Sequence, residues 1–182
     1  MLFALVRLGE PSTLPWFLPG VAISIVLALA AGGRVGRALG VRRAVAVGLI
    51  VSFGIIVSAT LTPLDGVVDV GAAGTGSCDF TRLGLPKLGE LLKINDTSLN
   101  VLLFVPLGVS IAFMPRSRAR VVVAVAAIAL PFAIEATQLL VPLLARGCES
   151  ADIVDNLIGL AIGLSLGLVA GWLLPGVRRS ER

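Results

Sequence analysis

Three long runs of this sequence contain no charged residue, and they limit the possible fold more than any other feature. They cover residues 14–33, 44–62 and 158–174, and each is close to the ~20 apolar residues that a helix needs to cross a bilayer. Of the 182 residues, 57% are hydrophobic and only 14% are charged, whereas about a quarter of the residues in a soluble domain are charged. The sequence therefore predicts an integral membrane protein.

Five membrane-spanning helices are expected. Because a bilayer contains no water to satisfy backbone N–H and C=O groups, its apolar spans should be helical. The expected spans cover residues 14–33, 43–62, 98–115, 121–143 and 153–174. Four of them are followed by residue types that end helices, namely Gly32-Gly33, Pro63, Pro115 and Pro175-Gly176. We expect one all-α polytopic helix bundle over residues 1–182, with one long outer loop.

The positions of the basic residues predict how the bundle is oriented. Ten of the fifteen Lys and Arg residues lie in the connections that begin at Arg34 and at Arg116, or in the tail after Pro175. Basic residues accumulate in short cytoplasmic connections, so these segments are expected inside the cell. The N-terminus, residues 63–97 and residues 144–152 then lie outside, and the C-terminus lies inside. This explanation of the basic charge leaves no reason to expect nucleic-acid binding.

The two outer loops contain the only two cysteines, Cys78 and Cys148. An oxidising exterior permits a disulfide between them, and two free thiols buried as small apolar side chains are the alternative. The longer loop also has a Gly-rich stretch from Gly66 to Gly76. After this stretch, four leucines share one helical face and predict either an interfacial amphipathic helix or an irregular loop packed on the bundle: Leu85, Leu88, Leu91 and Leu92.

Two further patterns concern helix ends and helix packing. The run Asn95-Asp96-Thr97-Ser98 supplies side chains that cap the N-terminus of the third span. In the fifth span, small residues recur every four positions and predict a smooth face for close packing, either within the chain or between two copies. This strip consists of Gly159, Gly163, Gly167 and Gly171.

Polar residues within the expected spans are informative, because an ionised side chain at a helix centre costs ~2.5–3.5 kcal/mol on insertion scales. Glu135 lies about 12 Å before the expected outer end of the fourth span, and Gln138 is one turn further along the same face. Asp152, Asp155 and Asn156 begin the fifth span, and Asn100 begins the third. With the expected orientation, all of these residues lie in or near the outer leaflet.

Two interpretations of this polar cluster remain open: a network that holds the helices together, or an outward-facing pocket for a ligand. For the pocket, we expect the ligand-binding residues to be Asn100, Glu135, Gln138, Arg146, Asp152 and Asn156. Arg146 is the natural counter-ion of Glu135, because it is the one basic residue in the loop between the fourth and fifth spans. The chain has no His and no Tyr, and we assign no catalytic residue, metal or cofactor.

Several of these residues fall into ordered motifs. They are NVLLFVPLG at 100–108, EATQ at 135–138, and Arg146 followed by DIVDNLIG at 152–159 and by Gly163, with a weaker TLTP at 60–63. Over roughly residues 45–172, this order and spacing resembles the VanZ-like family of membrane proteins. The family usually has an apolar residue where Asp155 stands, so Asp155 is a departure, as is the Gly-rich loop with Cys78.

The resemblance implies a multipass protein of the bacterial cell membrane, since the family is named for an accessory protein of resistance to the glycopeptide teicoplanin. We expect a cell-envelope accessory or binding protein whose partner is a membrane lipid, a lipid-linked cell-wall precursor or a lipophilic glycopeptide. One alternative is an intramembrane enzyme that acts on such a lipid-linked substrate, with Glu135 or Asp152 as general base or as ligand of a divalent cation. A small transporter is a third, less supported by five spans without an inverted repeat. The sequence does not determine the oligomeric state.

The expected orientation can be tested with reporter fusions. Fusions made after Ala44 and after Arg118 should both report a cytoplasmic location, because both positions lie in arginine-rich connections. An extracytoplasmic signal at Arg118 would contradict the orientation and, with it, the placement of the polar cluster in the outer leaflet.

Overall fold

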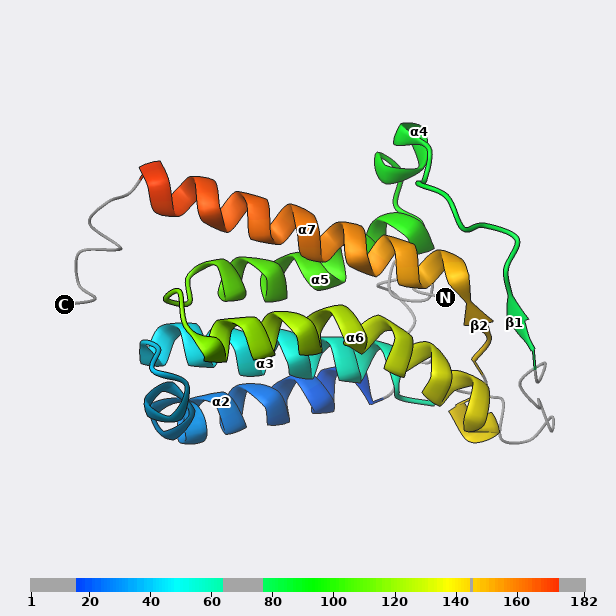
Figure 1. Cartoon of the computed structure of the whole chain (residues 1–182). Coiled ribbons are helices and arrows are strands. Elements are labelled where there is room, and N and C mark those ends of the chain that lie inside the picture. Colours follow the sequence, from blue (N-terminus) through cyan, green and yellow to red (C-terminus); the bar gives the residue numbers. More distant parts are fainter. Residues whose placement is uncertain (1–15, 64–76, 145, 174–182) are drawn as a thin grey trace.

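The computed structural model describes residues 16–63, 77–144 and 146–173. Within them the helices are α2 (Phe17–Leu39), α3 (Arg43–Thr60), α4 (Leu88–Leu91), α5 (Asp96–Ala112), α6 (Arg118–Leu140) and α7 (Ser150–Leu173) (Figure 1). A 3-10 turn (Pro142–Leu144) and two short strands, β1 (Cys78–Asp79) and β2 (Cys148–Glu149), complete these ranges. The all-α bundle expected from the sequence is confirmed. The Gly-rich stretch up to Gly76 and the basic tail lie outside the described residues.

Four of the described helices are long and apolar enough to cross a membrane: α2, α3, α6 and α7. The remaining expected span is α5, whose 17 residues extend roughly 26 Å, slightly less than the ~30 Å of a hydrocarbon core. This helix packs against α3 and α7, and its Phe104 and Ile111 side chains are fully buried in the hydrophobic core. The five expected spans thus correspond to four long helices and the shorter α5, which packs against α3, α6 and α7, while α2 packs on α3.

The end of the first span differs from the expectation. Helix α2 continues past Gly32-Gly33 and ends at Gly40, whose φ of 65° is left-handed, a conformation that glycine adopts readily. A side chain on Gly32 would overlap Val47 of α3. The expectation that Gly32-Gly33 ends the helix is therefore wrong. Gly32 lies inside the helix, where its lack of a side chain lets α2 pack closely on α3.

The start of α5 agrees with the expected cap. The Asn95 side chain accepts a hydrogen bond from the Ser98 backbone N–H at 2.9 Å, and the Ser98 hydroxyl accepts one from the Asn95 N–H at 3.2 Å. Together they satisfy two of the donors that a helix leaves unpaired at its N-terminus.

The glycine strip of α7 faces α5. A methyl group on Gly159 would overlap the carbonyl oxygen of Val101, and one on Gly163 would overlap that of Val105. These contacts advance by four residues along both helices, so α5 and α7 run in the same direction with their backbones in contact. The strip is used for packing within the chain, which is one of the two uses that its spacing predicted.

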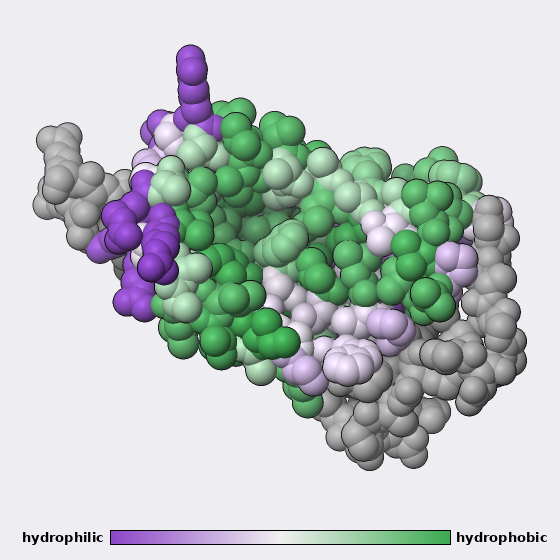
Figure 2. Space-filling view, turned by 90° about the horizontal axis from the view of Figure 1, so that it is seen from below, coloured by the Kyte–Doolittle hydropathy of each residue, from purple (hydrophilic) through white to green (hydrophobic). Residues whose placement is uncertain are grey.

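Strongly hydrophilic side chains gather at one end of the bundle, next to a largely apolar surface (Figure 2). The end that we call the arginine end contains Arg34, Arg37, Arg42, Arg43, Arg116, Arg118 and Arg120. Between the ends, large side chains such as Leu27, Val125 and Leu166 are exposed on the surface. An apolar belt of this kind is expected where lipid, rather than water, surrounds the helices.

The opposite end, which we call the disulfide end, has Cys78 and Cys148 joined in a disulfide with their Cα atoms 4.5 Å apart. Strands β1 and β2 pair in parallel, with Cys78 opposite Cys148. The sequence left this bond open against two free thiols. Its structural effect is to tie the long loop to the short connection between α6 and α7.

The expected amphipathic helix is reduced to one turn, α4, which projects from the bundle (Figure 1). Leu85, Leu88 and Leu92 are 80%, 72% and 79% exposed, so they do not pack against the rest of the chain. Exposed leucines at the end of a bundle that spans a membrane have the position of interfacial anchors.

The disulfide can be tested by thiol labelling. Protein denatured without reductant should take up no label, and the same protein should take up two labels per chain after reduction, because the sequence has two cysteines. Two labels before reduction would contradict the bond, and a Cys78→Ser variant, which should expose one thiol without reduction, calibrates the assay.

Candidate functional site

Polar side chains from three helices and one connection are buried at the disulfide end. They include all six residues that the sequence predicted for a ligand site: Asn100 of α5, Glu135 and Gln138 of α6, Arg146, and Asp152 and Asn156 of α7. The close contact of Gly159 with Val101 places the N-terminal half of α7 beside the N-terminal half of α5. The site is therefore assembled where α5 and α7 begin and α6 ends.

The C-terminal end of α3 positions two of these side chains. Gln138 Nε2 donates a hydrogen bond to the carbonyl oxygen of Thr60 at 2.9 Å, and Arg146 Nε donates one to that of Thr62 at 3.0 Å. The last carbonyls of a helix have no partner within it and carry a partial negative charge. An amide and a guanidinium satisfy two carbonyls at this end, which explains the role of the TLTP segment at 60–63.

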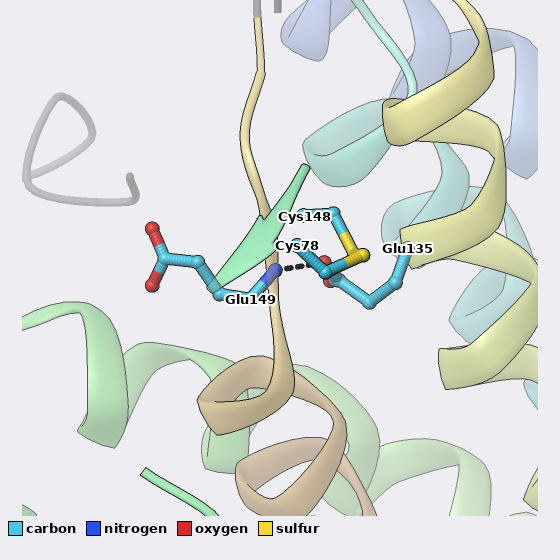
Figure 3. Close-up of a disulfide and its surroundings, with 4 residues drawn as sticks. All are labelled: Cys78, Glu135, Cys148 and Glu149. Carbon is cyan, nitrogen blue, oxygen red and sulfur yellow. Dashed lines mark hydrogen bonds between the residues drawn. A yellow bond between two sulfur atoms is a disulfide. The ribbon is translucent and has the colours of Figure 1, made fainter. Parts of the chain in front are cut away.

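Glu135 binds the backbone of β2. Its Oε2 atom accepts a hydrogen bond from the Glu149 N–H at 2.7 Å, beside the disulfide, while the Glu149 side chain points the other way (Figure 3). The expected ion pair with Arg146 is wrong, since no ion pair joins the two among the described residues. The reason is geometric: β2 offers Glu135 a backbone donor, and Arg146 is turned toward α3.

Arg146 nevertheless places a positive charge close to two carboxylates. Burial lowers the pKa of its guanidinium to about 10, and the nearby Asp152 and Glu135 carboxylates act in the opposite direction. Because this pKa remains well above 7, the guanidinium stays charged at neutral pH. Arg146 thus interacts with the Asp152 and Glu135 side chains by electrostatic attraction at a distance rather than by a direct hydrogen bond.

Sequence reasoning missed Arg82, which binds the start of α7. Its guanidinium pairs with the buried carboxylate of Asp155 and donates to the carbonyl oxygen of Ala151 at 3.3 Å, and its own carbonyl accepts from the Ser150 hydroxyl at 2.9 Å. Two sequence features could have indicated it. Arg82 is the one arginine in residues 63–97, and it follows Cys78 by four positions, so a disulfide to Cys148 brings it near α7.

Five buried polar atoms of this cluster have no hydrogen-bond partner among the residues that the structure describes. Two are donors and three are acceptors: Asn100 Nδ2, Arg146 Nη2, Gln138 Oε1, Asp155 Oδ1 and Asn156 Oδ1. An unpaired buried polar atom costs about 1–3 kcal/mol, and buried polar groups in native proteins are satisfied by protein, water or ligand. The mixture of donors and acceptors fits a polar organic group.

The same cluster is a poor match to a metal site. Within the described ranges, no group of three or more His, Cys, Asp or Glu side chains is placed to hold a metal ion.

Comparison with known proteins gives one match. A family profile described as VanZ/LLP1 matches residues 52–171, a range that contains all six predicted ligand-binding residues. No curated protein and no solved structure matches the chain.

The pair of Arg82 and Asp155 makes a prediction about stability. Replacing Arg82 by Ala leaves a carboxylate buried without a partner, so we expect a loss of roughly 3 kcal/mol in the free energy of unfolding, measured by chemical unfolding in detergent. The matched control is Lys93→Ala, which breaks the exposed pair with Glu90 and should cost less than about 1 kcal/mol. Adding Asp155→Asn to Arg82→Ala should recover part of the loss. Equal stability of the Arg82 and Lys93 variants would contradict the pairing.

Proposed function

Because the chain belongs to the VanZ/LLP1 family and has the composition of a membrane protein, we propose that it is an accessory or binding protein of the bacterial cell envelope. Its disulfide end faces the exterior, with the N-terminus outside and the C-terminus in the cytoplasm. The buried polar cluster binds the head group of a membrane lipid, of a lipid-linked cell-wall precursor or of a lipophilic glycopeptide of the teicoplanin type.

The observation that carries this proposal is the set of five unpartnered buried atoms. Sugars, phosphates and peptide amides of envelope precursors present donors and acceptors together, as these five atoms require. The charged guanidinium of Arg146, whose Nη2 atom has no partner within the described ranges, favours a ligand with an anionic or strongly accepting group.

Two features near the cluster support a ligand with an apolar portion. Leu85, Leu88 and Leu92 are exposed on the segment that precedes α5, and the outer surfaces of α6 and α7 are apolar. A ligand that is anchored in the bilayer could therefore keep its acyl chain among lipids while its head group reaches the ends of α5, α6 and α7.

An intramembrane enzyme is less well supported by the same contacts. A general base needs a carboxylate oxygen that can reach the substrate proton, whereas one oxygen of Glu135 is engaged by the Glu149 N–H at 2.7 Å. In the binding hypothesis, this hydrogen bond is useful because it holds β2 and the adjoining connection in place beside the ligand.

The proposal predicts that Glu135→Gln and Asp152→Asn proteins fold and insert normally but lose the envelope or glycopeptide phenotype of the wild type. The amide oxygen of Gln can still accept the Glu149 hydrogen bond, so the anchoring of β2 is preserved. Loss of one charged hydrogen bond should weaken ligand binding about 10- to 100-fold. The measurement is resistance, or binding of a labelled glycopeptide, at equal protein abundance in the membrane.

Glu90→Gln is the matched control, because Glu90 is a half-exposed carboxylate on α4 and the substitution removes the same charge. It should leave the phenotype unchanged. If both cluster variants keep full activity at wild-type abundance, the ligand site is ruled out and the cluster is a structural network.

A further inference from the structure

A second polar feature lies at the other end of the bundle, far from the disulfide. A cavity of about 480 Å³ opens between the start of α3, the end of α5 and the connection to α6. Three arginines line it, Arg42, Arg116 and Arg120, and its other walls include Val45, Val109 and Phe113. It therefore combines positive charge with an apolar lining.

Two of these arginines also line a neighbouring groove. Arg116 and Arg120 begin a hollow that continues along α6 past Val121 and Val125 to Ile128, with Leu168 of α7 as another wall. From Arg120 to Ile128 the helix rises roughly 12 Å. The groove thus leads from the charged end of the bundle into the apolar belt.

Within the described part of the chain, no ion pair is formed by Arg116 or Arg120. The described acidic residues lie at or toward the disulfide end, from Asp79 to Asp155, where Arg82 and Lys93 pair with Asp155 and Glu90. Among the described residues, the Arg120 guanidinium donates one hydrogen bond, to the carbonyl oxygen of Met114 at 3.2 Å. A guanidinium has five N–H donors, so most of the donor capacity of Arg120 remains for another acceptor.

We propose that this cavity and groove bind an anionic phospholipid, with its phosphate against Arg116 and Arg120 and an acyl chain along α6 and α7. The positive-inside rule explains arginines in a connection, but it does not require them to border an apolar cavity. Basic pockets at the cytoplasmic ends of membrane helices recognise anionic head groups, and the planar guanidinium matches a phosphate in a bidentate manner. The apolar walls favour a lipid over a free phosphate ion.

This lipid site is independent of the proposed function, because it shares no residue with the cluster at the disulfide end. Its test is native mass spectrometry of the purified full chain in detergent, titrated with phosphatidylglycerol or with phosphatidylcholine. We expect retained phosphatidylglycerol and much weaker retention of the zwitterionic lipid. Equal retention of the two lipids would overturn the proposal.

Charge variants then locate the site. Arg116→Gln with Arg120→Gln should weaken phosphatidylglycerol binding on the order of tenfold or more. The matched control, Arg34→Gln with Arg37→Gln, removes the same charge from a separate hollow at the same end, and it should bind nearly as well as the wild type. An equal loss in the two double variants would show general surface attraction and overturn the proposal.

A variant without a charge change tests the shape of the cavity. Ala44 is exposed and lines the cavity, so Ala44→Phe should fill part of it without disturbing the core. We expect weaker binding of phosphatidylglycerol at unchanged thermal stability. Unchanged binding in Ala44→Phe, together with unchanged binding in the Arg116 and Arg120 variant, would show that the lipid is held elsewhere.

Discussion

The backbone contact between α5 and α7 is the constraint on which the polar end of the molecule depends. Gly159 and Gly163 lie so close to the carbonyls of Val101 and Val105 that neither can have a side chain. Lipid tails are as apolar as leucine, so helices in a bilayer associate through such close packing rather than through the hydrophobic effect. The register of this contact places Asp155 and Asn156 beside the first turn of α5.

The carboxylates of Glu135 and Asp155 are buried away from water at this end, and each needs a partner. Glu135 accepts a hydrogen bond from a backbone N–H of β2, and Asp155 pairs with Arg82 from the long loop. Both partners come from the segments that the disulfide joins, since Cys78 and Cys148 are bonded where β1 and β2 pair. Breaking a buried ion pair by removing one partner is costly, so this loop is part of the fold.

The two ends of the bundle then have opposite chemistry. The disulfide end has buried carboxylates, amides and one buried guanidinium, all close to the ends of helices. The arginine end has exposed guanidinium groups beside apolar hollows. We propose a polar organic head group as the ligand of the first end and an anionic phospholipid as the ligand of the second. This asymmetry follows from the charge distribution along the chain, because the arginine-rich connections alternate with the segments that the disulfide joins.

Much of the architecture followed from the sequence itself. Charge-free runs of about 20 residues leave a helix as the stable structure in a bilayer, so the bundle, its approximate spans and the depth of the polar cluster were predictable. The spacing of Gly159 and Gly163 predicted close packing but not the partner helix, whereas the cap at Asn95 was predictable because it depends on residues close in the chain. The end of α2 was not, since Gly32 has a partner in α3 that its local sequence does not reveal.

The partners of the polar side chains were decided by tertiary structure alone. The sequence placed Glu135 near Arg146 in depth, yet Glu135 bonds the Glu149 backbone and Arg146 bonds Thr62. Asp155, which departs from the family pattern, acquires its partner from Arg82, 73 residues away. The hydrophobicity of a span is a sum over its own residues, and it determines how deep each residue lies in the membrane. A hydrogen bond depends instead on the distance and direction between two groups, and it exists only after the helices have packed.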